Sequence, residues 1–171
     1  TLLSEFNLGW WRSQCGAVMQ EGYLFSDTIA RNIAISDDEP DIERIRQAAR
    51  VANIADYIEA LPLGYNTMIG QDGQGISQGQ RQRILIARVV YKNPMFVFLD
   101  EATNALDANN ERAITENLAE FYKGKTVVVV AHRLSTVRDA DQIVVLDAGK
   151  IVEVGTHEEL TAKRGKYFAL V

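Results

Sequence analysis

Several features are scarce in this sequence of 171 residues, and cysteine is the first. Cys15 is the single cysteine, so no disulfide can form within the chain, which suits a reducing compartment. Uninterrupted apolar runs reach only five residues, as in 127–131, whereas a membrane-spanning helix needs roughly 18. The formal net charge of -5 lacks the positive surplus that general binding to nucleic acid or anionic lipid requires, so we expect no nucleic-acid partner.

A phosphate-binding loop is also missing, because no G-x-x-x-x-G-K-[ST] pattern occurs in the sequence. The stretch GISQGQRQRI nevertheless indicates part of a phosphate site. Ser77 precedes Gln80 by three residues, the spacing of a capping box, and Gly79 lets a ligand approach the backbone. Since helix N-termini favour anions, the sequence presents half of a nucleotide site and leaves open where the other half lies.

The order of the predicted elements indicates a mixed α/β fold in which a mostly parallel sheet is joined to an α-helical subdomain. The predicted helices include 27–33, 41–51, 54–61, 77–92 and 109–122. The predicted strands are 15–19, 95–100, 126–131 and 141–147, the last followed by a hairpin partner, while 67–75 is expected to be a loop. The continuous apolar runs in 95–100 and 126–131 are typical of strands buried on both faces.

Polar side chains follow three of these strands. Asp100 and Glu101 end MFVFLDE, His132 follows VVVVA, and Gln20 follows GAVM. Because ligands bind at the carboxyl ends of parallel strands, we expect these side chains on one edge. A carboxylate there can hold Mg²⁺, usually through water, and a second can deprotonate an attacking water. Taken alone, Asp100 and Glu101 suit a solvated strand end equally well, and a histidine at a strand end is more often structural than catalytic. Together these residues form a specific constellation.

At these residues the sequence resembles the nucleotide-binding (ATPase) domain of ABC transporters. ISQGQRQR resembles the signature motif Leu-Ser-Gly-Gly-Gln, FVFLDEAT resembles Walker B, NALD the D-loop, and AHRLST the switch-histidine segment. VMQEGYLFSDTIARNI resembles the Q-loop as exporter-type members write it, and the order of motifs holds over 11–160. WWRSQCGAVMQEG further resembles bacterial peptide or bacteriocin exporters that carry a peptidase domain.

The resemblance implies a partial P-loop NTPase (RecA-like) lobe, with ATP and Mg²⁺ as ligands. It assigns 1–20 to the end of the N-terminal part of the ATPase core, 21–93 to a helical subdomain with the signature motif, and 94–171 to the RecA-like half with Walker B and the switch histidine.

Roles for individual residues follow from the same resemblance. Asp100 and Gln20 would hold Mg²⁺, and Gln20 would also sense the γ-phosphate and couple to the membrane domain. Glu101 would be the general base, and His132 would steady the γ-phosphate and the water. Both Glu101 and His132 are therefore the expected catalytic residues.

The resemblance also explains why only half of a site is visible. In this family ATP lies between two head-to-tail domains, so the signature segment would bind ATP held by a second nucleotide-binding domain. The signature residues expected to do so are Ser77, Gln78, Gly79 and Gln80, with Gln78 standing where the family often has glycine. Asp107 would carry signals across the dimer. Walker A is expected upstream of Thr1, so we expect an N-terminally truncated domain that is inactive alone.

We therefore expect the ATPase domain of an ABC exporter, joined to a transmembrane domain at the cytoplasmic face of a bacterial cell membrane. One alternative is a non-transport ABC ATPase of DNA repair or chromosome maintenance. Those proteins usually separate the signature from Walker B by long insertions, whereas Ser77 and Asp100 stand only 23 positions apart. Another alternative is that the isolated chain is a catalytically inert interaction fragment.

The sequence also predicts the positions of two further groups of residues. Arg81, Arg83 and Arg88 are expected on a helix surface in ion pairs rather than on phosphate. Tyr23, Leu24 and Phe25 are expected to be partly exposed apolar residues at a groove for a partner.

Overall fold

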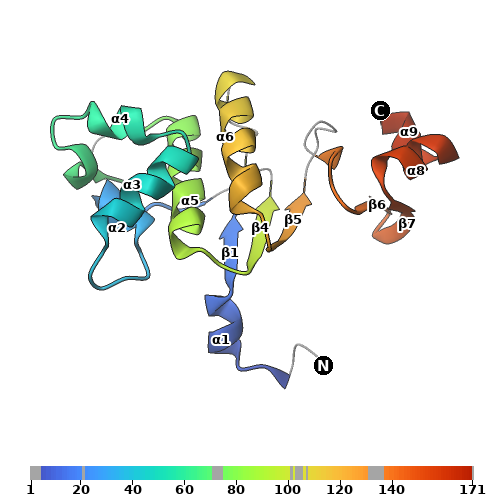
Figure 1. Cartoon of the computed structure of the whole chain (residues 1–171), viewed down its shortest axis with the longest axis horizontal. Helices are drawn as coiled ribbons and strands as arrows, with labels where there is room; N and C mark the ends of the chain where they lie inside the picture. The colour runs from blue at the N-terminus through green and yellow to red at the C-terminus, as the bar shows by residue number, and fades with distance from the viewer. Residues whose placement is uncertain are drawn as a thin grey trace. The chain divides into compact units, whose positions relative to one another are not determined.

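The computed structural model describes residues 5–20, 22–70, 75–100, 102, 106, 108–130 and 137–170. These residues belong to two compact units, Thr1–Val128 and Val129–Val171, each of which is described by itself. The elements that begin in the first unit are α1 (Leu8–Ser13), β1 (Cys15–Val18), β2 (Asp27–Thr28), α2 (Ile29–Ile33), α3 (Ile42–Val51), α4 (Ala55–Glu59), the 3-10 helix η2 (Gly64–Asn66), β3 (Met68–Ile69), α5 (Gln78–Lys92), β4 (Phe96–Asp100), α6 (Ala108–Phe121) and β5 (Thr126–Val130), the last of which crosses the boundary (Figure 1). The second unit contains β6 (Ile143–Asp147), β7 (Lys150–Gly155), α8 (His157–Lys163) and α9 (Lys166–Leu170).

A three-stranded sheet in the order β1-β4-β5 begins in the first unit. Strands β1 and β4 are parallel, with Cys15 opposite Phe96 and Val18 opposite Leu99. Figure 1 shows the arrowheads of all three strands pointing the same way. The parallel sheet predicted from the sequence is therefore present, and it brings the carboxyl ends of its strands to one edge.

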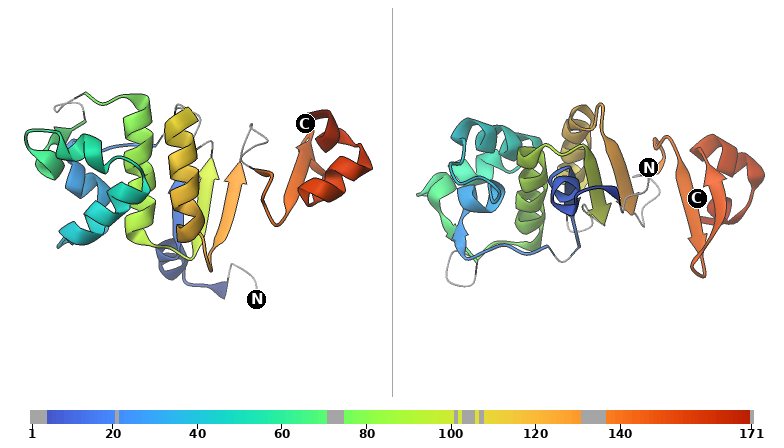
Figure 2. Two further views of the ribbon diagram at one scale, coloured as in Figure 1. Left: turned by 45° about the horizontal axis from the view of Figure 1, so that its top comes forward. Right: turned by 90° about the horizontal axis from the view of Figure 1, so that it is seen from below.

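Burial across this sheet is one-sided, which corrects the expectation of strands buried on both faces. Val97 is 1% exposed, whereas its neighbour Phe98 is 36% exposed, and Val128 and Val130 of β5 are 46% and 54% exposed. Helix α5 packs against β1 and supplies the cover on one side, and Figure 2 shows α5 and α6 running alongside the strands. Alternate side chains of a strand point to opposite faces, so only every second residue is covered by these helices.

A cluster of helices packs along α5. Helix α5 contacts α2 and α3, and α3 contacts α4. The buried side chains of this cluster include Ile29, Ile33, Ile45, Ile58 and Ile84, each 1% exposed or less. Burying such side chains contributes roughly 1.5–3 kcal/mol apiece, so this apolar contact holds the helices together.

Short strands replace parts of one predicted helix and one predicted loop. The predicted helix 27–33 begins only at Ile29, because Asp27 and Thr28 form β2 and the Thr28 side chain caps α2 by accepting from Arg31 N–H. Strand β2 pairs in antiparallel fashion with β3, which lies within the predicted loop 67–75. The predicted helix 41–51 is confirmed, with its first residue serving as the cap of α3.

The second unit is a hairpin packed on two helices. Strands β6 and β7 are antiparallel, as predicted, and the turn between them places Ala148 and Gly149 at φ of 47° and 75°. Two successive residues with positive φ match the turn that best fits the twist of a two-residue hairpin. A small apolar core lies between the sheet and the helices; it consists of Ile143, Val145, Leu160 and Tyr167.

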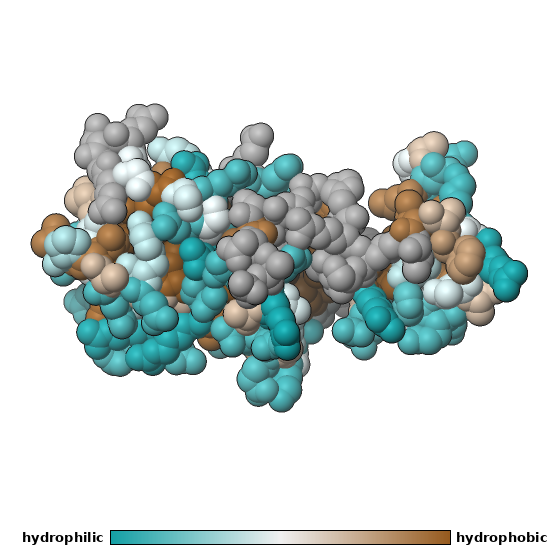
Figure 3. All heavy atoms as spheres, turned by 90° about the horizontal axis from the view of Figure 1, so that it is seen from above, coloured by the Kyte–Doolittle hydropathy of each residue, from teal (hydrophilic) through white to brown (hydrophobic). Residues whose placement is uncertain are grey.

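Large apolar side chains also reach the surface of both units. Figure 3 shows brown apolar atoms among teal polar ones on the first unit and again on the second. Within the described ranges, no helix combines the length and the apolar character needed to cross a membrane. The assignment of 1–20, 21–93 and 94–171 to separate parts of the fold remains a prediction.

Candidate functional site

The parallel pairing of β1 and β4 determines where two of the predicted site residues lie. Val18 is opposite Leu99 at the end of the paired stretch, so Asp100 is the next residue on β4 and Gln20 lies two residues beyond β1. Both residues therefore lie at the carboxyl edge of the sheet. Glu101, His132 and Asp107 fall outside the described residues, so their joining Gln20 and Asp100 remains a prediction.

The start of α5 lies at this same edge because α5 runs antiparallel to β1. A Cβ added to Gly16, near the start of β1, would come within 2.9 Å of Val89 late in α5. A Cβ added to Gly22, after β1, would instead collide with Leu85, one turn earlier in the helix. Lys92 at the end of α5 donates to the carbonyl of Cys15 at 2.6 Å. The N-terminus of α5 is consequently directed toward the end of β1 that carries Gln20.

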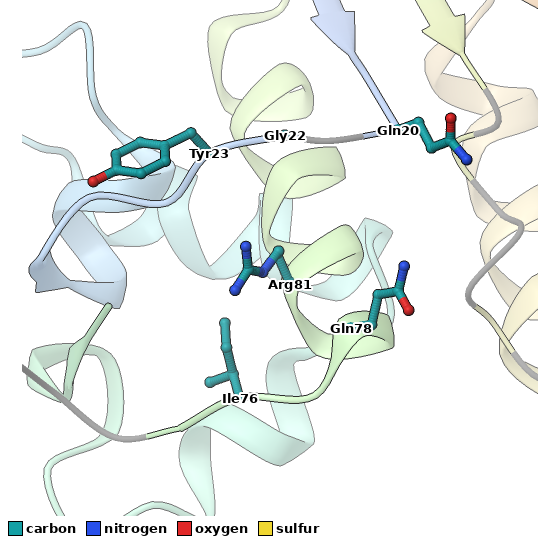
Figure 4. A pocket seen from close by; sticks show the side chains of 6 residues that line it. All are labelled: Gln20, Gly22, Tyr23, Ile76, Gln78 and Arg81. Atoms are coloured by element: carbon teal, nitrogen blue, oxygen red, sulfur yellow. The ribbon is translucent and has the colours of Figure 1, made fainter. Parts of the chain in front are cut away.

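Within the first unit, a pocket of about 360 Å³ lies between the residues that follow β1 and the start of α5. Its lining residues are Gln20, Gly22, Tyr23, Ile76, Gln78 and Arg81. Figure 4 shows Gln20 just after the end of β1, and Gln78 and Arg81 on the first turns of α5. The structure thus brings Gln20 and Gln78, two of the predicted ligand-binding residues, to the walls of one pocket.

The signature residues build a capping box at the start of α5, as the sequence predicted. Ser77 Oγ accepts a hydrogen bond from Gln80 N–H at 3.2 Å, and Gln80 Oε1 accepts one from Ser77 N–H at 2.8 Å. Gln80 therefore holds the backbone of the turn with its side chain. The exposed Ser77 hydroxyl keeps its own proton for a ligand, and first-turn N–H groups have no partner within a helix. This arrangement is suited to an anion such as a phosphate.

Arg83 fixes the first turn of α5 to two other elements. Its Nε donates to the carbonyl of Gly79 at 3.4 Å, while Nη1 donates to the carbonyl of Asn53 at 2.7 Å and to Asn110 Oδ1 at 3.0 Å. Asn53 has φ of 51°, and its side-chain amide also donates to Asn110 Oδ1 at 2.9 Å. The signature turn is therefore tied to the connection before α4 and to the start of α6.

Arg81 is exposed, as the sequence predicted, whereas Arg88 differs from the expectation. Arg81 lines the pocket, where it brings a positive charge close to Gln20 and Gln78. Arg88 is half buried and donates to backbone carbonyls, so the prediction of a surface position is wrong for it. Burial lowers the pKa of the Arg88 guanidinium. The sequence offered one signal for the position of Arg88: residues 81, 85 and 88 are spaced to fall on a single face of a helix, which also carries the apolar Leu85.

The segment after Gln20 has the exposure that was expected at two of three positions. Tyr23 and Phe25 are 61% and 47% exposed, and their rings meet edge to face with centroids 5.1 Å apart. Leu24 is 7% exposed, so the prediction of partial exposure is wrong for this residue, whose side chain alternates into the interior.

The comparisons with known proteins agree with this geometry. The family model described as ABC transporter matches residues 3–104. The chain belongs to the ABC transporter family. It is 48% identical, over 98% of its length, to the ATP-dependent lipid A-core flippase of Alkalilimnicola ehrlichii. It is also 48% identical, over 99% of its length, to ABC transporter B family member 21 of Arabidopsis thaliana.

A solved structure of an ABC transporter shows the same fold. The structure of a bacterial Atm1-family ABC exporter with ATP bound aligns over 98% of the chain, with a TM-score of 0.93 and 39% identity. The chain thus matches the ATP-binding domain of exporter-type members, and the non-transport alternative is not favoured. It spans 29% of the flippase, 13% of the Arabidopsis protein and 30% of the Atm1-family chain. The relatives come from bacteria and eukaryotes, and the resemblance to peptidase-containing exporters remains a prediction.

Proposed function

We propose that the chain supplies the ATP-hydrolysing machinery of an ABC exporter and binds ATP at the carboxyl edge of its parallel sheet. One observation carries this proposal. The parallel register of β1 and β4 puts Gln20 and Asp100 at one edge, and the N-terminus of α5 is directed to that edge. In open α/β sheets this edge is where ligands bind.

The residues at the edge have the donor atoms that a magnesium nucleotide requires. Asp100 offers carboxylate oxygens and Gln20 an amide oxygen, and hard oxygen ligands are those that Mg²⁺ prefers. When bound there, the ion neutralises charge on the phosphates. Glu101 takes the proton of the attacking water, and His132 orients the γ-phosphate and that water.

A second nucleotide-binding domain completes the proposed site. Ser77, Gln78 and Gly79 contact the γ-phosphate of ATP that the partner domain holds, and Gln80 keeps the turn in shape through its bond to Ser77 N–H. Asp107 links the two sites across the dimer. A transmembrane domain contacts the exposed Tyr23 and Phe25, and the complex places this chain on the cytoplasmic side of a membrane.

Replacing Asp100 in the complete transporter tests this proposal. In Asp100→Asn the side chain keeps its size but loses the charge that favours Mg²⁺, so we expect magnesium-dependent ATP turnover to fall by at least about 100-fold. Asp141→Asn is the matched control, since Asp141 is exposed and lies in the second unit. Undiminished turnover by Asp100→Asn would overturn the proposed role of the strand edge.

The 171 residues alone should bind MgATP weakly. The chain has no G-x-x-x-x-G-K-[ST] loop, and the loss of about three charge-assisted hydrogen bonds at roughly 1.5–3 kcal/mol each lowers affinity about a thousandfold or more. Calorimetric titration measures this affinity. A dissociation constant in the micromolar range for the 171-residue chain would contradict the expectation.

A further inference from the structure

The backbone that leads away from Gln20 is held by a buried asparagine. Asn32 of α2 is 1% exposed. Its Oδ1 accepts a hydrogen bond from Phe25 N–H at 2.8 Å, and its Nδ2 donates to the carbonyl oxygens of Phe25 and Thr28, each at 3.0 Å. One side-chain amide therefore satisfies both backbone groups of Phe25, as a neighbouring strand would. The path of residues 22–28 depends on this side chain.

Arg88 ties this asparagine to α5. Arg88 Nε donates to the backbone carbonyl of Asn32 at 2.8 Å, and Nη2 donates to Asn32 Oδ1 at 3.3 Å. Nη1 donates to the carbonyl of Tyr23 at 3.1 Å, and the guanidinium carbon lies 5.9 Å from the centroid of the Phe25 ring. These bonds use three different nitrogen atoms of one planar group. A lysine ammonium is a point charge and cannot reproduce that fork.

The same face of α5 connects this contact to the pocket. Arg81 lines the pocket, Leu85 packs closely on Gly22, and Arg88 binds the carbonyl of Tyr23. Spacings of four and three residues place these three side chains along one side of the helix. Gln20 and Tyr23 lie on the opposite wall of that pocket. The signature helix therefore contacts the segment that follows Gln20 at two points, Gly22 and Tyr23.

We propose that Arg88, acting through Asn32, is a positioning residue that holds Gln20 in register with the signature helix. The inference rests on the proposed function, because it assigns Gln20 a part in ATP turnover. In this proposal Arg88 acts on Gln20 through the backbone and is not itself a ligand of nucleotide or metal. It fixes the residues that follow Gln20 to α5. The distance between Gln20 and the start of α5, on the two sides of the pocket, therefore stays constant while ATP is bound and hydrolysed.

Two substitutions in the complete transporter test the clamp formed by Arg88 and Asn32. Arg88→Gln removes the charge and the fork, while Arg88→Lys keeps the charge and loses the fork. Hydrogen exchange at the Phe25 amide reports on the clamp directly, because that N–H donates to Asn32 Oδ1. We expect its exchange to be faster by about tenfold or more in Arg88→Gln, since the lost bonds come from a charged group, and by less in Arg88→Lys.

Turnover measurements show whether the clamp positions Gln20. The kcat for ATP should fall in the same order, Arg88→Gln more than Arg88→Lys. The affinity for ADP measured without Mg²⁺ should stay unchanged, because neither the γ-phosphate nor the ion that Gln20 would contact is then present. Arg46→Gln is the matched control: Arg46 is partly exposed on α3 and pairs with Glu43 at 2.8 Å. It should leave both Phe25 exchange and kcat at wild-type values.

Several outcomes would overturn the inference. Unchanged Phe25 exchange in both variants would show that Arg88 does not hold the segment. Faster exchange with unchanged kcat would show that Gln20 is not positioned by it. Faster exchange throughout α5, with kcat and ADP affinity lost together, would reduce Arg88 to a structural role. A wild-type transporter that hydrolyses no ATP would instead refute the proposed function, and Phe25 exchange would still decide whether the clamp exists.

Discussion

The two capping boxes of this chain allow the structural and the ligand-binding roles of Ser77 to be separated. Ser77→Ala removes the acceptor of Gln80 N–H at the start of α5. Thr156→Ala removes the equivalent acceptor at the start of α8, where Thr156 Oγ1 accepts from Glu159 N–H at 3.3 Å. Loss of such a cap costs about 1 kcal/mol in either place. Each variant should therefore loosen its own helix start by a similar amount.

The effect on ATP turnover should differ sharply between the two variants. If the Ser77 hydroxyl also donates to a γ-phosphate, its loss removes a further charge-assisted hydrogen bond of roughly 1.5–3 kcal/mol, which corresponds to about 10- to 100-fold in kcat/KM. Thr156 lies in the second unit and has no role in the proposed site. We expect Thr156→Ala to hydrolyse ATP at the wild-type rate.

Two assays on the complete transporter distinguish these effects. Amide exchange at Gln80 and at Glu159 measures the loss of each cap, with an increase of about fivefold expected for about 1 kcal/mol. Steady-state ATP hydrolysis measures the ligand contact. Equal turnover by Ser77→Ala and Thr156→Ala, with equal loss of the caps, would refute the assignment of Ser77 to phosphate binding and leave it as a helix cap.

Three further predictions concern stability. Gly16→Ala should lower the free energy of unfolding by about 1–3 kcal/mol in urea titration, because its Cβ would lie 2.7 Å from Pro94 Cγ; an unchanged midpoint would contradict this close packing. Ile84→Ala should cost about 2–5 kcal/mol, since Ile84 is 0% exposed, whereas Ile42→Ala, at a 44% exposed position, should cost under about 1 kcal/mol; equal costs would refute the assigned core. Burial raises the pKa of the Tyr122 phenol above its usual 10.0, so its contribution to stability is complete below about pH 10 and declines above it, where the unfolded chain loses the proton more readily. Thermal unfolding on either side of that pH should show a smaller decline for Tyr122→Phe, and an identical decline would contradict the shift.

The parts of the fold that the sequence predicts are those determined by local pattern. The spacing of Ser77 and Gln80 predicted a helix start that the structure confirms. The apolar run before Asp100 predicted β4, and local turn residues predicted the hairpin of β6 and β7. In each case neighbouring residues carry the signal, so no knowledge of distant contacts is needed.

The parts that the sequence does not predict depend on residues far apart in the chain. Strands β2 and β3 have two residues each, too few for a periodic pattern, and they exist because they pair with each other. The half-buried position of Arg88 depends on Asn32, 56 positions away. The exposure of Phe98 depends on which elements cover the sheet, which an apolar run cannot reveal.

The candidate site shows the same division. Strand ends and the parallel register bring Gln20 and Asp100 to one edge, as the pattern of strands predicted. The pocket shared by Gln20, Gln78 and Arg81 was not predicted, because it requires the antiparallel course of α5 along β1. Sequence patterns indicated the chemistry of single residues, whereas tertiary packing determined which of them line the same pocket.

The most direct test of the account is ATP hydrolysis by the complete transporter with Glu101→Gln. This change removes the proposed base while leaving Asp100 and the signature residues in place, so turnover should fall by about 10²- to 10⁴-fold while MgATP binding is retained. Glu116→Gln serves as the control, because Glu116 is an exposed residue of α6 that pairs with Arg112 at 2.9 Å. Hydrolysis by Glu101→Gln at the rate of the wild type would contradict the central claim that this chain provides the catalytic base.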